Sequence, residues 1–514
     1  MSYIITQMVR GKPYAYEAEA YWDPIKKQSR QRRKYLGAIG ADGSIVPKTS
    51  QREVTLSKTF GPSYLLTELA EQAGLLERLK GAFGPEAEEI LALAITRIVR
   101  PAALRNVQPL LDESFLPEIL GLERELTSQR LSAFLASLSR RDGEMRAFFR
   151  SLVSEDDALI FDITSLSSSS RSIDLLEYGA DYRATGLPQI NLGLVVSLSD
   201  HCPLYYKLFP GSVTDVVTLR NLVAEVRDLG VRECMFVLDR GFYSESNVNE
   251  LLDAGMDFLM PLPFGRGVAK RLVTESNRTL SDPRLGHILD GELYRVHESR
   301  VDIAGRDLTA FVIVSEKRMA DEKRTLFSRL QDIEASLNGR KWHPDMKAVL
   351  NDVAKRHASF LTVRNVDGVV RLERRRNAIA QAENRCGKML LMTSKDMSWN
   401  EALTRYRLRD EAERDFDQLK NELGAEPLRV SSPASLRGHL FVLFVSLVLR
   451  SLLLERASGA KLLGKYWIDD MLLELAKLKA TRIGEDWRLS EMTRKQRELL
   501  LKLGVPLPQD PLPR

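Results

Sequence analysis

The stretch YRLRDEAERDFDQLK, residues 406–420, places mixed charges and one aromatic ring on a single predicted helix. It contains no Gly or Pro and is rich in strong helix formers, so the sequence predicts a helix. At about 100° per residue, one face carries Tyr406, Arg409, Glu413 and Lys420. Helices of mixed charge are usually solvent-exposed with i,i+4 pairs, and this segment alone favours that interpretation. A carboxylate flanked by cations also suits a site that holds a metal ion and a phosphate together.

The composition is that of a globular protein with substantial cores. Of the 514 residues, 44% are hydrophobic and 28% are charged, and the net charge is +5. This balance permits a nucleic-acid partner without requiring one. Two basic clusters are typical of phosphate-binding surfaces, with solvated loops as the alternative interpretation. The clusters are Lys26, Lys27, Arg30, Arg32, Arg33 and Lys34, and Arg371, Arg374, Arg375 and Arg376.

Cysteine usage and hydropathy indicate a cytoplasmic protein with no membrane partner. Cys202, Cys234 and Cys386 lie far apart and form neither a disulfide framework nor a zinc pattern. The first 22 residues lack the charged-then-apolar layout of a signal peptide. The longest apolar run, 440–449, is too short to span a bilayer and predicts a buried helix that ends near Arg450.

Two acidic residues stand at unusual places in a predicted α/β region. Strands and helices alternate over 155–265, which predicts a mixed sheet. Asp162 lies within the apolar run 159–163, and Asp239 ends the run 235–239. A carboxylate in a central strand is costly to bury unless it is paired or binds a metal, although either acid could instead cap the following turn. Two such acids and a helix carboxylate would supply oxygen ligands for Mg²⁺.

The helix at 406–420 offers three candidates for that third carboxylate. Asp410, Glu413 and Asp417 lie on nearly the same helical stripe, so each could reach a shared metal ion. Physical reasoning from the residues leaves the choice open. We expect the two acids that do not bind metal to pair with nearby basic groups such as Arg414 and Lys420.

Taken together, these segments resemble the DDE transposases of bacterial insertion sequences. More narrowly, they resemble the group with a Tyr-x2-Arg-x3-Glu-x6-Lys signature, which residues 406–420 match without departure, and a β-rich insertion before the catalytic Glu. FDITS at 161–165 resembles the strand of the first Asp, and VLDRGFYSESN at 237–247 resembles that of the second. PLYYKLFPGSVTDVVTL at 203–219 resembles the connection between them, with a departure at Ser212 that concerns loop shape.

The resemblance implies a ribonuclease-H-like α/β domain interrupted by the insertion, and it selects Glu413 among the three helix acids. Two Mg²⁺ ions, for which Mn²⁺ can substitute, would be held by Asp162, Asp239 and Glu413. The DNA near the cut would be contacted by Tyr406, Arg409, Lys420 and Arg240. The implied activity is two-metal hydrolysis and transesterification of phosphodiesters.

By the same resemblance, the partner is double-stranded DNA, both the inverted repeat ends of the element and the target. The protein would be a transposase that cuts these ends and joins them to a new site, acting as a homodimer on DNA in the nucleoid. Two alternatives stay open. One is a catalytically silent or domesticated DNA-binding protein of the same fold, and the other is a metal-dependent nuclease without strand transfer.

The pattern divides the chain into six predicted regions. They are a basic, β-rich N-terminal region with a candidate DNA contact (1–56), a helical domain for DNA end binding or dimerisation (57–152), the first part of the catalytic domain (153–264), a β-rich insertion (265–396), the second part of the catalytic domain with the Glu helix (397–460), and C-terminal helices with a tail (461–514).

Overall fold

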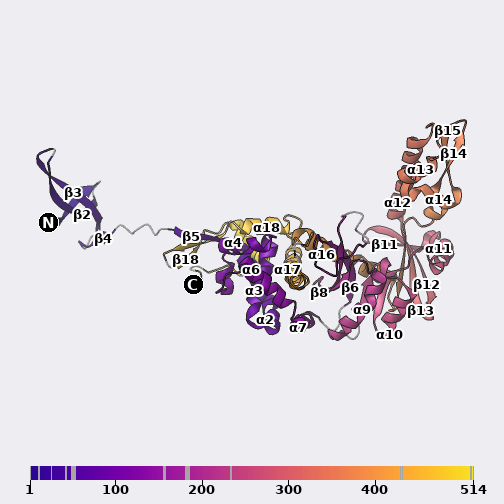
Figure 1. Ribbon diagram of the computed structural model, residues 1–514, viewed down its shortest axis with the longest axis horizontal. Helices are drawn as coiled ribbons and strands as arrows, with labels where there is room; N and C mark the ends of the chain where they lie inside the picture. Colours follow the sequence, from indigo (N-terminus) through magenta and orange to yellow (C-terminus); the bar gives the residue numbers. More distant parts are fainter. Residues whose placement is uncertain are drawn as a thin grey trace.

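The computed structural model arranges the chain as a small sheet, a helical bundle, a large sheet and a projecting arm along one long axis (Figure 1). The described residues are 2–9, 12–24, 26–40, 43–47, 54–153, 158–179, 186–231, 234–428, 430, 432–484, 486–509 and 512. The predicted α/β class with a mixed sheet is confirmed.

The N-terminal sheet is an antiparallel meander in the order β1-β2-β3-β4. Its strands are β1 (Ser2–Val9), β2 (Lys12–Asp23), β3 (Gln28–Ile39) and β4 (Ile45–Pro47). Strand β3 begins earlier than predicted, so most of the first basic cluster lies on the strand and not on the turn before it. Cross-strand neighbours explain this, because Arg32 faces Glu19 and Lys34 faces Glu17 on β2.

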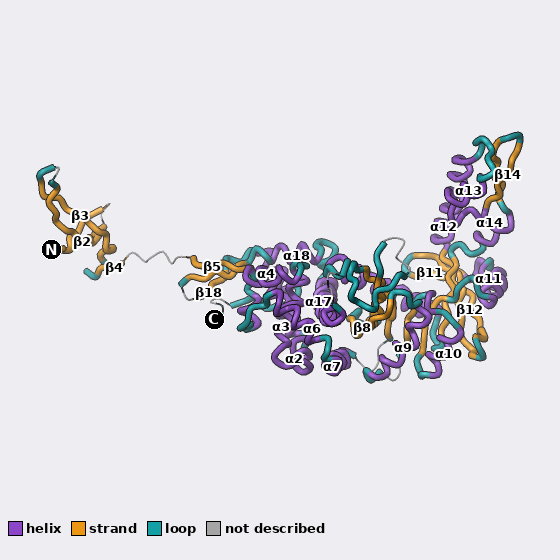
Figure 2. Tube along the Cα trace, in the orientation of Figure 1, coloured by secondary structure: helices purple, strands orange, loops and turns teal. Residues whose placement is uncertain are grey.

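A helical bundle follows and packs around the long buried helix α17 (Pro433–Gly459) (Figure 2). The bundle helices are α1 (Gly61–Gln72), α2 (Leu75–Phe83), α3 (Ala87–Val99), α4 (Val107–Glu113), α5 (Leu116–Leu120), α6 (Ser128–Leu138) and α7 (Asp142–Leu152). The predicted buried helix at 440–449 is confirmed within α17. Across the described ranges, every helix falls short of the length and apolar character that crossing a membrane needs.

The large sheet has nine strands in the order β11-β12-β13-β16-β10-β9-β6-β7-β8. Strand β6 pairs in parallel with β9, which pairs in parallel with β10, whereas β7 and β8 continue antiparallel from β6. Its first strands and their helices are β6 (Leu159–Ser167), β7 (Gln189–Ser197), β8 (Pro203–Pro210), α9 (Asp215–Asp228), β9 (Met235–Leu238), α10 (Glu245–Asp253), β10 (Asp257–Pro261) and α11 (Gly267–Leu280). Strands β6 and β9 have neighbouring strands on both sides, and every residue of β9 is buried.

Residues 265–396 were predicted to form a separate β-rich insertion. In the structure most of their strands instead extend the large sheet. Strand β16 (Lys388–Thr393) pairs with both β10 and β13, a contact between distant segments that hydropathy alone does not reveal. The other strands are β11 (Gly286–Leu289), β12 (Glu292–Ile303) and β13 (Arg306–Ser315).

The part that projects from the sheet is mainly helical and has its own small core (Figure 1). This arm contains α12 (Glu316–Leu337), α13 (Met346–Ala354), β14 (Leu361–Val366), β15 (Val369–Arg374) and α14 (Arg376–Glu383). Strands β14 and β15 form a hairpin with Asp367-Gly368 at its turn, and both turn residues have positive φ.

The C-terminal region contains helices as predicted, and it adds two strands that were not predicted. Strand β17 (Lys479–Ile483) pairs with β18 (Asp486–Leu489) and with β5 (Val54–Thr59). These three strands form a small sheet that joins the segment before the helical bundle to the C-terminal region. The flanking helices are α18 (Ile468–Leu475) and α19 (Arg494–Lys502). The predicted boundary at 56/57 therefore falls inside a strand.

The close crossing of α17 over α6 provides a test of the bundle. A Cβ at Gly438 would lie 2.1 Å from the carbonyl oxygen of Leu135. We expect Gly438→Ala to lower the free energy of unfolding by about 1–3 kcal/mol, because the backbones must separate. Chemical denaturation measures the change.

Gly81→Ala in α2 is the matched control, because a Cβ there has no atom within 4 Å. It should be neutral or stabilise by about 0.5–1 kcal/mol. Equal effects of the two substitutions would contradict the crossing.

Candidate active site

Strands β6 and β9 bring the first two predicted acids together. Phe161 on β6 pairs with Leu238 on β9 in parallel register, so Asp162 and Asp239, the next residues, are neighbours at one edge of the pair. Asp162 lies within its strand, where the side chain is 16% exposed. Asp239 follows its strand directly and is 41% exposed. The alternating side-chain directions of a strand therefore place both carboxylates at one site.

The helix predicted at 406–420 is broken into three pieces. Helix α15 (Trp399–Leu408) ends before Arg409, α16 (Asp410–Asp417) follows, and a π-helical turn occupies Gln418–Glu422. At the break, the Arg409 N–H donates to the Tyr406 carbonyl three residues back, which is a tighter turn than the α-helix. The predicted helix is thus confirmed apart from a one-residue interruption at Arg409, whose backbone angles (φ −57°, ψ −30°) are still helical, and the change to a π-helical turn at its end.

Arg409 occupies the centre of the acidic site. Its Nη1 lies 3.2 Å from Asp162 Oδ2 and 3.9 Å from Asp239 Oδ1. Its Nη2 donates to Glu413 Oε1 at 2.7 Å. The three predicted carboxylates, which are distant in sequence, therefore meet at one guanidinium. With Arg409 they form a group that we call the acid–arginine cluster.

Burial makes this guanidinium a strong counter-charge. The Arg409 side chain is 11% exposed, and its Cζ lies 5.7 Å from the centre of the Tyr406 ring. Burial raises the pKa of Tyr406 to about 12, so this ring stays neutral and can act as a cation–π partner. Tyr406 and Arg409 therefore lie together beside the acids, as the sequence interpretation required.

Asp162 is the carboxyl group that the site perturbs most clearly. Burial raises its pKa to about 6, and the nearby charges of Asp239 and Glu413 act in the same direction. The Ile163 N–H, which donates at 2.9 Å, and the Arg409 guanidinium oppose the rise. A buried carboxyl group with one cation is thus only partly compensated.

The remaining predicted residues lie elsewhere on the same elements. Lys420 is in the π-helical turn and pairs with Glu426 at 3.6 Å, so it does not join the acid–arginine cluster. Arg240 follows Asp239 and is exposed. Asp417 accepts from Asn421 at 2.6 Å and does not pair with Lys420 as expected.

Asp410 is more distant from the guanidinium than Glu413. It is 67% exposed, and its Oδ1 lies 4.0 Å from Arg409 Nη2. Of the three candidate acids on this helix, Glu413 makes the closest contact with the guanidinium.

The donor set of the cluster fits a divalent cation. Three carboxylates offer the hard oxygen ligands that Mg²⁺ and Mn²⁺ prefer. Within the described ranges, however, no three His, Cys, Asp or Glu side chains are already grouped as a metal cage. The carboxylates instead point at Arg409, so a bound cation and this guanidinium would compete for the same oxygens.

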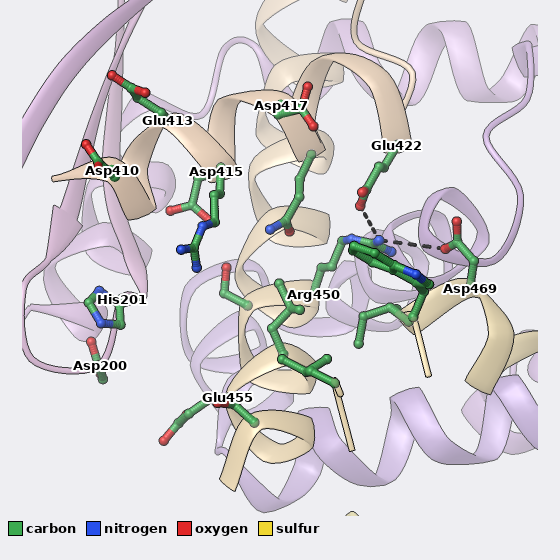
Figure 3. Close-up of a pocket in the computed structure, with 18 of the residues that line it drawn as sticks. Asp200, His201, Asp410, Glu413, Asp415, Asp417, Glu422, Arg450, Glu455 and Asp469 are labelled. Atoms are coloured by element: carbon green, nitrogen blue, oxygen red, sulfur yellow. Dashed lines mark ion pairs between the residues drawn. The ribbon is translucent and has the colours of Figure 1, made fainter. Parts of the chain in front are cut away.

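Sequence reasoning missed the charged residues behind α16. Arg450 is 5% exposed and pairs with Glu422 and, at 3.6 Å, with Asp469 (Figure 3). A single arginine that interrupts a long apolar run was the available signal. Its partners were not identifiable, because both lie far from it in sequence.

Comparisons with known proteins identify the family of the region that contains this site. The family described as the transposase DDE domain matches residues 154–449, which contain all three acids. No curated protein matches the chain. Among solved structures, a cryo-EM structure of the piggyBac transposase synaptic complex with hairpin DNA matches with a TM-score of 0.39 and 11% identity, over 76% of this chain and 70% of that chain. A score this low carries no argument.

Removal of the Arg409 guanidinium tests whether it neutralises the carboxylates of the acid–arginine cluster and competes there with a divalent cation. In the absence of divalent cations, Arg409→Ala should lower the free energy of unfolding by about 3–5 kcal/mol, because Asp162 loses its buried partner. Mg²⁺ or Mn²⁺ should stabilise this variant more than the wild type, because the competing cation is gone. Thermal unfolding with and without metal measures both effects.

Arg405→Ala is the matched control, since Arg405 forms a surface pair with Glu401 on the same helix. It should cost less than about 1 kcal/mol and leave the metal response unchanged. A metal response of Arg409→Ala equal to that of the wild type would contradict the competition.

The raised pKa of Asp162 predicts a pH dependence of stability. The folded protein binds this proton more tightly than the unfolded chain, so the carboxyl group favours folding at pH 4 and progressively loses that contribution up to pH 6. Without metal, the wild type should lose up to about 3 kcal/mol more unfolding free energy than Asp162→Asn between pH 4 and 7. Denaturant titrations across this range measure the difference, and parallel pH curves would contradict it.

Proposed function

The chain belongs to the transposase DDE domain family, and from this premise we propose that it cuts and joins DNA at the ends of its own insertion sequence. The observation that carries the proposal is the meeting of Asp162, Asp239 and Glu413 at Arg409. The order β8-β7-β6-β9-β10, with β7 and β8 antiparallel, is the arrangement expected of a ribonuclease-H-like domain.

The chemistry supplied by two bound Mg²⁺ ions would be activation of a water or a DNA 3′-OH and stabilisation of the leaving oxygen. Asp162 is held by its strand and by the Ile163 N–H, so it would fix the position of the site. Glu413 is 57% exposed on a helix that follows a break, so it can adjust its position when the guanidinium releases it.

Arg409 would then exchange carboxylates for DNA phosphate. A guanidinium binds carboxylate and phosphate through the same paired N–H geometry, so this transfer needs no new donor. Tyr406 would hold the stem of Arg409 through the ring contact. Arg240 is exposed beside Asp239 and can approach the same backbone, while Lys420 would first have to leave Glu426.

The partner in this proposal is double-stranded DNA, bound by a homodimer that holds two element ends. The basic side chains of β3 and of the projecting arm support it, since they displace counterions from phosphates. Arg33 on β3 and Arg371 on β15 are representative, and both are exposed.

A cleavage assay on DNA that carries the element ends tests the proposal. With Mg²⁺ or Mn²⁺, the wild type should nick and then join strands, whereas Asp162→Asn, Asp239→Asn and Glu413→Gln should each lose at least about 100-fold in rate. Scoring nicks and joined products separately distinguishes a transposase from a nuclease.

Asp417→Asn is the matched control, because Asp417 lies one turn beyond Glu413 and bonds Asn421. It should keep cleavage within about threefold of the wild type, as for a surface substitution. Wild-type cleavage by Glu413→Gln would refute the site, and DNA binding without cleavage at either metal would show a silent DNA-binding protein.

A further inference from the structure

A pocket of about 1220 Å³ lies between α16, the π-helical turn and α17 (Figure 3). Glu413 and Asp469 lie at opposite sides of it, and Leu463, Trp467 and Ile468 also line it. We call it the α16–α17 pocket. It is larger than the roughly 300–1,000 Å³ that small ligands usually fill, so its size suits a polypeptide segment.

Carboxylates dominate the lining of this pocket. Those outside the acid–arginine cluster are Asp200, Asp410, Asp415, Asp417, Glu422, Glu455 and Asp469. The arginines of the lining are Arg414 and Arg450, and Arg450 is already paired with two of these acids. The pocket therefore attracts cations and repels phosphates.

Several buried polar atoms of the lining have no hydrogen-bond partner in the described part of the chain, among them Gln418 Oε1, Ser451 Oγ and Arg450 Nε. Each of these side chains is less than a tenth exposed. An unpaired buried polar atom costs about 1–3 kcal/mol, so a ligand that pairs with these atoms would gain affinity. The π-helical turn that carries Gln418 is a feature often found at functional sites.

The mouth of the pocket carries an exposed indole. Trp467 is 81% exposed although it lines the pocket. Exposed tryptophans of this kind are frequent anchors of protein interfaces, and their rings bind arginine side chains by cation–π contacts. Leu463, at 40% exposure, adds an apolar contact beside it.

The unpaired atoms decide among cationic ligands. Gln418 Oε1 needs a donor, whereas Arg450 Nε needs an acceptor. A polyamine offers donors only, so it would leave Arg450 Nε unpaired. A basic polypeptide in extended form offers N–H groups, carbonyl groups and cations together. Nucleic acid offers both kinds of group but brings phosphates to a lining of carboxylates.

The chain itself contains a basic strand that matches this requirement. Strand β3 carries Arg30, Arg32, Arg33 and Lys34, all exposed. Its sheet pairs with no other sheet among the described residues. Figure 1 places this sheet beyond β5, on the side away from α16, so the strand does not lie in the pocket of its own chain.

We propose that the α16–α17 pocket binds strand β3 of a second copy of the chain in the absence of DNA. The cations of β3 meet the carboxylates of the pocket, and one arginine stacks on Trp467. Two copies can exchange their strands reciprocally, which gives a closed dimer. This contact covers Glu413 and occupies the basic strand, so DNA and the second copy compete for β3.

The test is the self-association of the full chain by sedimentation velocity, without DNA or metal, at low and high salt. The wild type should dimerise at low salt and dissociate as salt rises. Glu455→Lys, Trp467→Ala and, on β3, Arg33→Glu should each weaken the dimer at least about tenfold. Arg33 is chosen because it faces Ala18 on β2, so the substitution adds no like-charge pair within the sheet.

Mixing two variants tests the identity of the strand. Glu455→Lys and Arg33→Glu should each be monomeric alone and should dimerise when combined. In that mixed dimer the pocket with Glu455→Lys receives the strand with Arg33→Glu, so both charges of this pair are reversed and still attract. The other pocket keeps the original pair of Glu455 and Arg33. Glu123→Lys, an exposed acid outside the pocket, is the control and should dimerise as the wild type does.

Three results would overturn the proposal. They are a wild type that is monomeric at low salt, variants that dimerise normally, and a mixture that stays monomeric. If Trp467→Ala weakened DNA binding and left the dimer intact, the pocket would be a nucleic-acid site instead. None of the self-association outcomes bears on strand cleavage, because that experiment contains neither DNA nor metal.

Discussion

The contact of one guanidinium with three carboxylates is the interaction on which the catalytic region depends. Asp162 and Asp239 are neighbours because β6 and β9 pair in parallel, and Glu413 comes from a helix more than 170 residues later. Like charges brought this close repel each other in a partly buried site, so a cation must stand among them. Arg409 supplies that cation from within the same signature segment. The folded protein thus carries its own counter-charge at the place where metal chemistry would occur.

The break at Arg409 has consequences on both sides. Before it, Tyr406 lies beneath the guanidinium and limits its motion. After it, α16 leads into the π-helical turn, where Lys420 pairs with Glu426 and Gln418 lies in the lining of the α16–α17 pocket. A straight helix would have aligned four signature side chains on one face. The altered turn divides them between the acidic site and the region behind it.

The rest of the molecule surrounds the acid–arginine cluster and helix α16. Helix α17 is buried along most of its length and fixes the wall behind α16, with Arg450 as its charged contact to Glu422. The bundle is closed by β5 and β17, which unite residues from the two ends of the chain. The projecting arm has its own core and is inserted in the chain between strands β13 and β16 of the large sheet. The two basic clusters, on β3 and on the arm, therefore lie outside the central strands of the large sheet.

The sequence by itself determined the two acidic strands, the helical character of 406–420 and the burial of 440–449. Each depends on hydropathy and propensity within a few neighbouring residues, and such local patterns survive folding. Family resemblance selected Glu413, which residue physics left equal to Asp410 and Asp417. Only the tertiary structure decided that Arg409 bridges the acids, that β16 joins β10 and β13, and that β17 pairs with β5. These contacts join residues far apart in the chain, so their energies depend on packing and strand register that no local pattern encodes.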